Sequence, residues 1–229
     1  KLKKSTLFFV FSLSVWSCSV DTESTSILHP SEYFGHKIGD PGVLIPHSKI
    51  LEYYRFMEER SDRVKVVEIG ETTEGRPFYY AIVTSPENHA RLDNLINMNS
   101  KLYDPRDVSD GEIQKIIREG KTFMVANHQI HSTEVGASQG ALLMAYRMAI
   151  GNDHEVSRIL DNVVLIHVPV HNPDGQERVY EWLDEWRGTD YENSRPPFLY
   201  QKYVGHDNNR DWYMFTQVET QLSIEIQNK

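Results

Sequence analysis

The sequence predicts an α/β fold with a mixed, mostly parallel sheet and helices on both faces of the sheet. Two short apolar runs, Phe123–Ala126 and Val163–Val168, have the length and composition of buried strands. Helical patterns lie next to them at Val135–Ile150, which is apolar almost all round, and at Glu155–Leu160. Strands that alternate with helices along a chain are typical of sheets with parallel strands, and this alternation indicates the fold class.

The chain before Phe123 supplies the other predicted elements. A helix is expected from Pro46 through Arg60, because apolar residues recur there at helical spacing. Val64–Ile69 and Phe78–Val83 predict two strands joined by a turn, in which Arg76 is expected to have a structural role. Two more helices are predicted, at Asn88–Leu102 and Gly111–Arg118.

Residues 1–17 have the pattern of a signal peptide. Three lysines among the first four residues precede the apolar run Leu7–Trp16, which is too short to span a bilayer. The stretch Val15–Cys18 resembles the cleavage box of a bacterial lipoprotein, which implies a lipid on Cys18 after cleavage. We therefore expect an extracytoplasmic protein, secreted or lipid-anchored to the bacterial cell envelope. The alternative is a plain secreted protein with a spare thiol at Cys18, the only cysteine.

Length and hydrophobic content favour a single domain after this leader. Residues 18–45 are interpreted as a polar tether and an irregular lead-in, with Tyr33–Leu44 at the surface, and residues 46–229 as the folded domain. A hydrophobic content of 39% over 229 residues is enough for one sizeable core. The 24 basic and 33 acidic residues give a formal charge of -9, which argues against nucleic acid or an anionic membrane surface as a partner.

His131 and Glu134 form the first candidate site. They lie in a polar loop that leaves a buried strand, where α/β proteins often place functional groups, and a His and a Glu three residues apart can converge on one zinc ion. The same residues also suit a helix start, with Ser132 or Thr133 as the cap and Glu134 near the positive helix end. The pair by itself leaves both interpretations open.

Two later motifs extend the pattern. In chain order, the three motifs are HSTE at His131–Glu134, NPDG at Asn172–Gly175 and GHDNNRDW at Gly205–Trp212. Together they resemble the zinc metallocarboxypeptidase family, the carboxypeptidase A-like zinc peptidases. The stretch Val66–Ser85 is also similar to the strand, turn and strand that open the catalytic domain of that family. The resemblance covers the chain from about Pro46 onward and implies that residues 46–229 are the N-terminal part of such a domain.

The resemblance implies a role for each matching residue. His131 and Glu134 are the first two zinc ligands, and Asp207 is the carboxylate that holds the ligating histidine through its other ring nitrogen. Asn209 and Arg210 match the pair that grips the terminal carboxylate of a peptide, a task that suits the planar guanidinium fork.

Arg187 resembles the family arginine that polarises the scissile carbonyl, and Arg195 is its rival. A simpler alternative for Arg210 is a surface ion pair with Asp207 or Asp211. The NPDG motif is expected to be a turn, a structural loop beside the site without a chemical role. Four further histidines are expected to serve packing or hydrogen bonding and not to bind metal: His128, His167, His171 and His206.

The implied activity is zinc-dependent hydrolysis of peptide bonds at the C-terminus of peptides, with free-acid peptides, including cell-wall peptides, as substrates. The third ligand, a histidine, and the general-base glutamate are expected beyond Lys229, so we expect an inactive chain when these 229 residues stand alone. Two alternatives share the fold. One is a non-catalytic peptide-binding module, and the other is a zinc amidase or endopeptidase that acts on cell-wall peptides.

Overall fold

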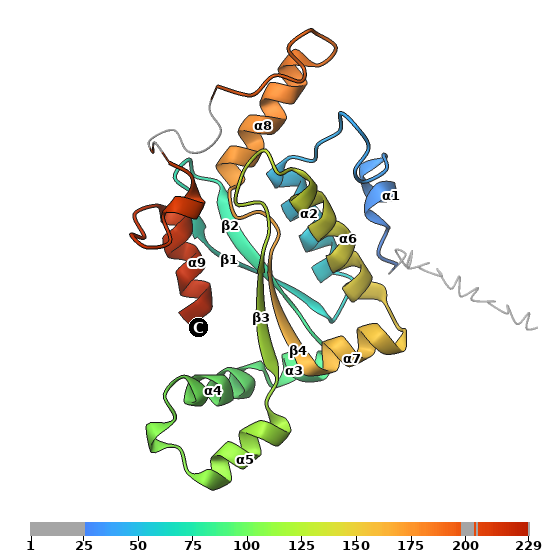
Figure 1. Ribbon diagram of the computed structural model, residues 1–229. Helices are drawn as coiled ribbons and strands as arrows, with labels where there is room; N and C mark the ends of the chain where they lie inside the picture. The colour runs from blue at the N-terminus through green and yellow to red at the C-terminus, as the bar shows by residue number, and fades with distance from the viewer. Residues whose placement is uncertain (1–25, 198–203, 205, 229) are drawn as a thin grey trace, which may run out of the picture.

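The computed structural model describes residues 26–197, 204 and 206–228 and confirms the α/β fold (Figure 1). The strands are β1 (Val64–Glu71), β2 (Pro77–Val83), β3 (Thr122–Asn127) and β4 (Val163–Val168). The helices up to β3 are α1 (Pro30–Phe34), α2 (His47–Glu58), α3 (Pro86–Ala90), α4 (Leu92–Tyr103), the 3-10 turn η1 (Pro105–Asp107) and α5 (Asp110–Glu119). The later helices are α6 (Gly136–Ile150), α7 (His154–Asn162), α8 (Pro173–Trp186), the 3-10 turn η2 (Asn208–Arg210) and α9 (Val218–Asn228).

The sheet is mixed, with the strand order β1-β2-β4-β3. Strands β3 and β4 pair in parallel, whereas β2 pairs with β1 and with β4 in antiparallel fashion. The predicted excess of parallel pairs is therefore absent among the described strands. The reason is that β1 and β2 form a hairpin, whose strands must be antiparallel, and β2 then joins β4 in the opposite direction.

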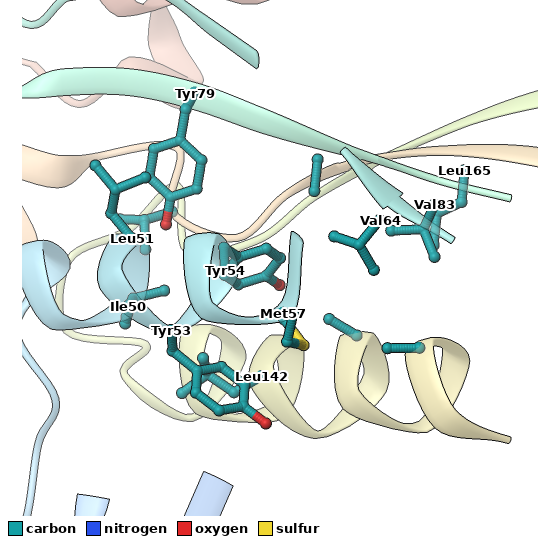
Figure 2. Packing of buried hydrophobic residues seen from close by; sticks show 14 of the residues in the cluster. Ile50, Leu51, Tyr53, Tyr54, Met57, Val64, Tyr79, Val83, Leu142 and Leu165 are labelled. Atoms are coloured by element: carbon teal, nitrogen blue, oxygen red, sulfur yellow. The ribbon is translucent and has the colours of Figure 1, made fainter. Parts of the chain in front are cut away.

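Each face of the sheet carries its own core, because alternate residues of a strand point to opposite faces. From β2, Tyr79, Ala81 and Val83 join the first core with α2, α6 and α7, and the intervening residues join the second core with α4 and α9. Figure 2 shows side chains of α2, among them Tyr54, lying between the sheet and Leu142 of α6. Helices therefore cover both faces, as the sequence predicts (Figure 1).

The lead-in before α2 is less irregular than predicted. Tyr33 and Phe34 of α1 pack against the first core, with the Tyr33 ring centred 4.9 Å from that of Tyr53. The Tyr53 hydroxyl also donates to Leu28 O at 2.8 Å, which ties this segment to α2. The expectation of a surface segment was thus wrong for these aromatic residues. The predicted signal peptide and Cys18 lie outside the described residues, and none of the described helices is long and apolar enough to cross a membrane.

Helix α9 packs on the hairpin through a glycine. A Cβ atom on Gly70 would lie 2.9 Å from Leu222 Cδ2, and the backbone φ of Gly70 is +155°. Glycine is therefore required where α9 meets β1. The segment that carries Asp207 and Arg210 is tied to the residue before α9, because the Asn208 side-chain amide donates to Gln217 Oε1 at 2.9 Å and the Gln217 N–H donates to Asp211 Oδ2 at 2.8 Å.

Three buried histidines take part in the cores. His167 Nδ1 lies 3.1 Å from the Tyr54 hydroxyl oxygen, and His171 Nδ1 lies 3.1 Å from Ser223 Oγ. His47 Nε2 lies 2.9 Å from Pro77 O. Burial lowers the pKa of His47 and of His171 to about 4 and that of His167 to about 3.

We expect acid to unfold the protein between pH 6.5 and about 4. Histidines of the unfolded chain titrate near pH 6.5, so the unfolded state takes up protons before the buried rings do. Stability is present above pH 6.5 and falls toward about pH 4, by on the order of 3 kcal/mol for each histidine. Far-ultraviolet circular dichroism across this range measures the acid midpoint.

The matched variants are His171→Gln and His154→Gln. The first should lower the acid midpoint, whereas the second, in an exposed residue of α7, should leave it unchanged. A free energy of unfolding that stays constant between neutral pH and about pH 4 would contradict the prediction.

Candidate metal centre

The loop 128–135 between β3 and α6 carries the first candidate ligands. Pairing of β3 with β4 continues past both strands, because the His128 N–H donates to Val168 O at 2.9 Å and the His171 N–H donates to His128 O at 2.8 Å. The chain then turns at Gln129, whose φ of 51° lies in the left-handed region. Parallel strands place their carboxyl ends at one edge of the sheet, so this loop lies beside the start of α8 (Figure 1).

The start of α8 holds the loop in place. Asn172 caps α8 by accepting from the Gly175 N–H at 2.9 Å, and its side-chain amide donates to Ile130 O at 3.4 Å. A Cβ atom on Gly175 would lie 2.6 Å from Ser132 Cβ, so glycine allows the helix to approach the loop this closely. The prediction of a turn at NPDG was therefore wrong, because Asn172 as cap and Pro173 in the first turn begin a helix.

His131 lies between two carboxylates. Its Nδ1 atom is 3.0 Å from Glu134 Oε1, and its Nε2 atom is 3.9 Å from Asp207 Oδ2. The Glu134 side chain is 61% exposed, whereas that of Asp207 is 15% exposed. The structure thus brings together three of the residues that the motifs select, although Asp207 is far from the other two in the sequence.

Asp207 has a separate contact for each carboxylate oxygen. Oδ1 accepts from the Arg210 N–H at 3.0 Å and so begins η2, while Oδ2 faces His131. A separation of 3.9 Å is too long for a hydrogen bond. It does place a negative charge beside the ring nitrogen that points away from Glu134, where a carboxylate can set the tautomer of a metal-binding histidine.

The capping alternative for HSTE does not describe the observed helix start. Helix α6 begins at Gly136 with Val135 at its N-cap position, and no side-chain hydrogen bond caps it. Glu134 instead forms part of a turn, in which its N–H donates to His131 O at 3.0 Å. The turn directs both side chains to the same place, as two ligands of one ion require.

Asn209 and Arg210 are exposed at the end of η2. Among the described residues Arg210 forms no ion pair. The carboxylate of the neighbouring Asp211 is already hydrogen-bonded, since its Oδ2 accepts from the Gln217 N–H at 2.8 Å. Burial raises the pKa of Asp211, but hydrogen bonds from Thr216 and Gln217 outweigh burial and lower it overall. The guanidinium of Arg210 is therefore open to an external anion.

Arg187 and Arg195, the two candidates for the arginine that polarises the scissile carbonyl, have different surroundings. Arg187 Nη1 donates to Gly42 O at 2.6 Å, which holds the guanidinium against the lead-in. Arg195 instead lines a hollow of about 680 Å³. Thr133 of the loop 128–135 and Gln139 of α6 line the same hollow. The lining includes Thr133 and Val135, the two sequence neighbours of Glu134, but neither His131 nor Glu134 itself.

The four further histidines of the sequence analysis, His128, His167, His171 and His206, take part in hydrogen bonds or ring contacts. The His128 ring is centred 4.7 Å from that of His167, and His206 Nδ1 lies 3.1 Å from Asp207 O. His171 packs against Trp212, with the ring centres 5.5 Å apart. Within residues 26–197, 204 and 206–228, no group of three or more His, Cys, Asp or Glu side chains that could hold a metal is present.

Comparisons with known proteins bear on the family and the fold of this chain. The profile of the Peptidase_M14 family, zinc carboxypeptidase, matches residues 50–228. The crystal structure of carboxypeptidase A from Helicoverpa armigera is similar with a TM-score of 0.51 at 16% sequence identity, over 81% of this chain and 42% of that chain. A metallo-carboxypeptidase from Burkholderia cenocepacia gives a TM-score of 0.48 at 20% identity, over 79% of this chain and 36% of that chain. This chain therefore spans less than half the length of either structure. No curated protein sequence matches it.

Proposed function

Because the chain belongs to the zinc carboxypeptidase family, we propose that the whole protein is a zinc-dependent hydrolase that removes residues from the C-terminus of peptides. The observation that carries the proposal is the setting of His131, whose two ring nitrogens face Glu134 and Asp207. A ligand pair with a carboxylate behind the histidine is the arrangement that catalytic zinc sites use.

The residues present fit a zinc ion as part of its ligand set. One imidazole nitrogen and one carboxylate oxygen, 3.0 Å apart, are suitable donors for zinc, and Glu134 is accessible from solvent. Zinc bound there with a third ligand would lower the pKa of a bound water and polarise a carbonyl oxygen. In this proposal the third ligand and the general-base glutamate come from beyond Lys229.

The other residues of the chain would bind and orient the substrate. Arg210 would pair with the terminal carboxylate through two parallel hydrogen bonds, with Asn209 beside it, and its open guanidinium supports this role. Arg187 would stabilise the negative charge that develops on the carbonyl oxygen, and its contact with Gly42 would hold it in one orientation. Substrates would therefore be peptides with a free C-terminus.

The whole protein is expected to contain one zinc ion per chain, and His131→Ala should remove most of it. A catalytic zinc site has only three protein ligands, so the loss of one strongly weakens binding. Metal analysis of the purified proteins measures this content. The control is His154→Ala, an exposed histidine of α7, which should retain zinc. Zinc content that is unchanged in His131→Ala would rule out the assigned ligand set.

A further inference from the structure

Gln129 has an unusual backbone conformation. Its φ of 51° lies in the left-handed region, which among the described residues other than glycine only Gln129 and Phe215 adopt. Glycine adopts this region without strain, and asparagine and aspartate adopt it more readily than other side chains do. A glutamine there costs backbone free energy, and such strain persists where the surrounding structure holds it, often at functional sites. The strain indicates a role for the side chain that glycine could not fill.

The side chain of Gln129 bridges the loop that carries the candidate ligands. It is 3% exposed, and its Nε2 donates to Ser132 O at 3.3 Å. Ser132 lies between His131 and Glu134 in the sequence and is fully buried. The hydrogen bond therefore joins the corner of the chain to the turn that brings His131 Nδ1 to 3.0 Å from Glu134 Oε1.

This bond restrains the loop at a place that its other restraints do not reach. Among the described residues, the pairing of β3 with β4 ends at His128, just before the corner. Asn172 of the next strand's loop donates to Ile130 O at 3.4 Å, which holds the chain ahead of the two ligands. The bond from Gln129 to Ser132 O holds the chain between the two ligands. Its loss would let the two ligand side chains move apart.

We propose that Gln129 is a positioning residue for the metal centre, and that its amide and its left-handed backbone together hold His131 and Glu134 at the separation that one ion requires. The inference rests on the proposed function as a zinc hydrolase. A ligand pair that is already held in place loses less conformational freedom when the metal binds, so the metal binds more tightly. Groups behind the ligands of a metal site commonly contribute to affinity in this way.

The test measures the zinc affinity of the whole protein by competition with a coloured chelator, so the readout does not depend on turnover. Gln129→Met keeps the size of the side chain and removes the donor. We expect its dissociation constant for zinc to rise about tenfold, the lower end of the effect of removing a group behind a metal ligand. The absorption spectrum of the cobalt-substituted protein should also change, because the spectrum depends on the arrangement of the ligands.

Gln176→Met is the matched control. Gln176 of α8 is also buried, and its Nε2 also donates to a backbone carbonyl, that of Ile45, at 2.6 Å. In both glutamines Oε1 has no hydrogen-bond partner among the described residues. Because each change removes one buried hydrogen bond, both variants should lower the thermal midpoint of the zinc-free protein. Only Gln129→Met should weaken zinc binding, since the bond of Gln176 joins α8 to the lead-in and not to the ligand loop.

Gln129→Gly decides the question if Gln129→Met does not fold, because glycine accepts a φ of 51° without strain. It should weaken zinc binding at least as much, since it removes the donor and also frees the corner. Zinc affinity equal to that of the wild type, or an equal loss in Gln176→Met, would overturn the inference and leave the proposed function standing. A wild type that binds zinc through His131 but cleaves no peptide with a free C-terminus would instead refute the proposed function.

Discussion

Replacement of Asp174 by alanine is expected to destabilise the fold by about 3–5 kcal/mol, the usual cost of breaking a buried ion pair. Asp174 is fully buried at the start of α8 and accepts from Thr72 Oγ1 at 2.6 Å, from the Glu74 N–H at 3.1 Å and from Arg76 Nη1 at 2.8 Å. Arg76 also pairs with Glu74 at 2.8 Å, and Arg178 of α8 pairs with the same Glu74. This network joins the turn between β1 and β2 to α8.

Thermal unfolding measures the effect. For a chain of this size, a loss of about 3–5 kcal/mol lowers the midpoint by roughly 6–20 °C. Glu185→Ala, at an exposed position of the same helix, should change stability by less than about 0.5 kcal/mol. The double variant Arg76→Ala with Asp174→Ala should cost less than the sum of the single variants, because the two charges depend on each other. Additive costs would show that the pair is not coupled.

The elements with strong periodic patterns could be predicted from the sequence. The apolar stripe after Pro46 and the apolar run Phe78–Val83 each carry a local signal, and both elements are present in the structure. The structural role expected for Arg76 is also confirmed, since its partner is a buried carboxylate. What could not be predicted is that partner itself. Asp174 lies about a hundred residues away, and no local pattern shows which charges a fold will bury together.

Strand directions and helix starts could not be predicted from the periodicity of apolar residues alone. The alternation of strands and helices indicated parallel strands, but it does not determine where a hairpin such as Val64–Val83 joins the sheet, so most described pairs are antiparallel. At NPDG, turn and helix-start signals share the same residues. Asn172 before Pro173 is also the pattern of a helix cap, and this signal could have identified α8.

The candidate site was predictable where residue types carry the chemistry. His131, Glu134 and Asp207 were selected from motifs, and their convergence is a finding of the structure. Gln139 could not be found in this way. A glutamine within a predominantly apolar helix has no distinctive spacing, and only the placed side chains show that its buried amide has no hydrogen-bond partner among the described residues.

Arg210→Ala in the whole protein is expected to reduce kcat/KM for free-acid peptides by roughly thirtyfold to several thousandfold. In a closed site, removal of one partner of a charge-assisted pair costs about 2–5 kcal/mol, since the substrate carboxylate is then left without a counter-charge. At about 1.4 kcal/mol per factor of ten, this cost gives the stated range. Arg210→Lys should retain part of the activity, because lysine keeps the charge but loses the planar fork. Steady-state kinetics with a free-acid peptide measures all three proteins.

The controls separate loss of the anchor from loss of the site. Zinc content should be the same in Arg210→Ala and in the wild type, because Arg210 contacts Asp207 only through its backbone N–H. Arg158→Ala, at an exposed position of α7, should leave the kinetics unchanged. The wild type should also cleave the C-terminally amidated peptide far more slowly than the free acid, since the amide lacks the charge that Arg210 would bind. Equal cleavage of acid and amide would exclude Arg210 as a carboxylate anchor and would favour an endopeptidase or amidase on this fold.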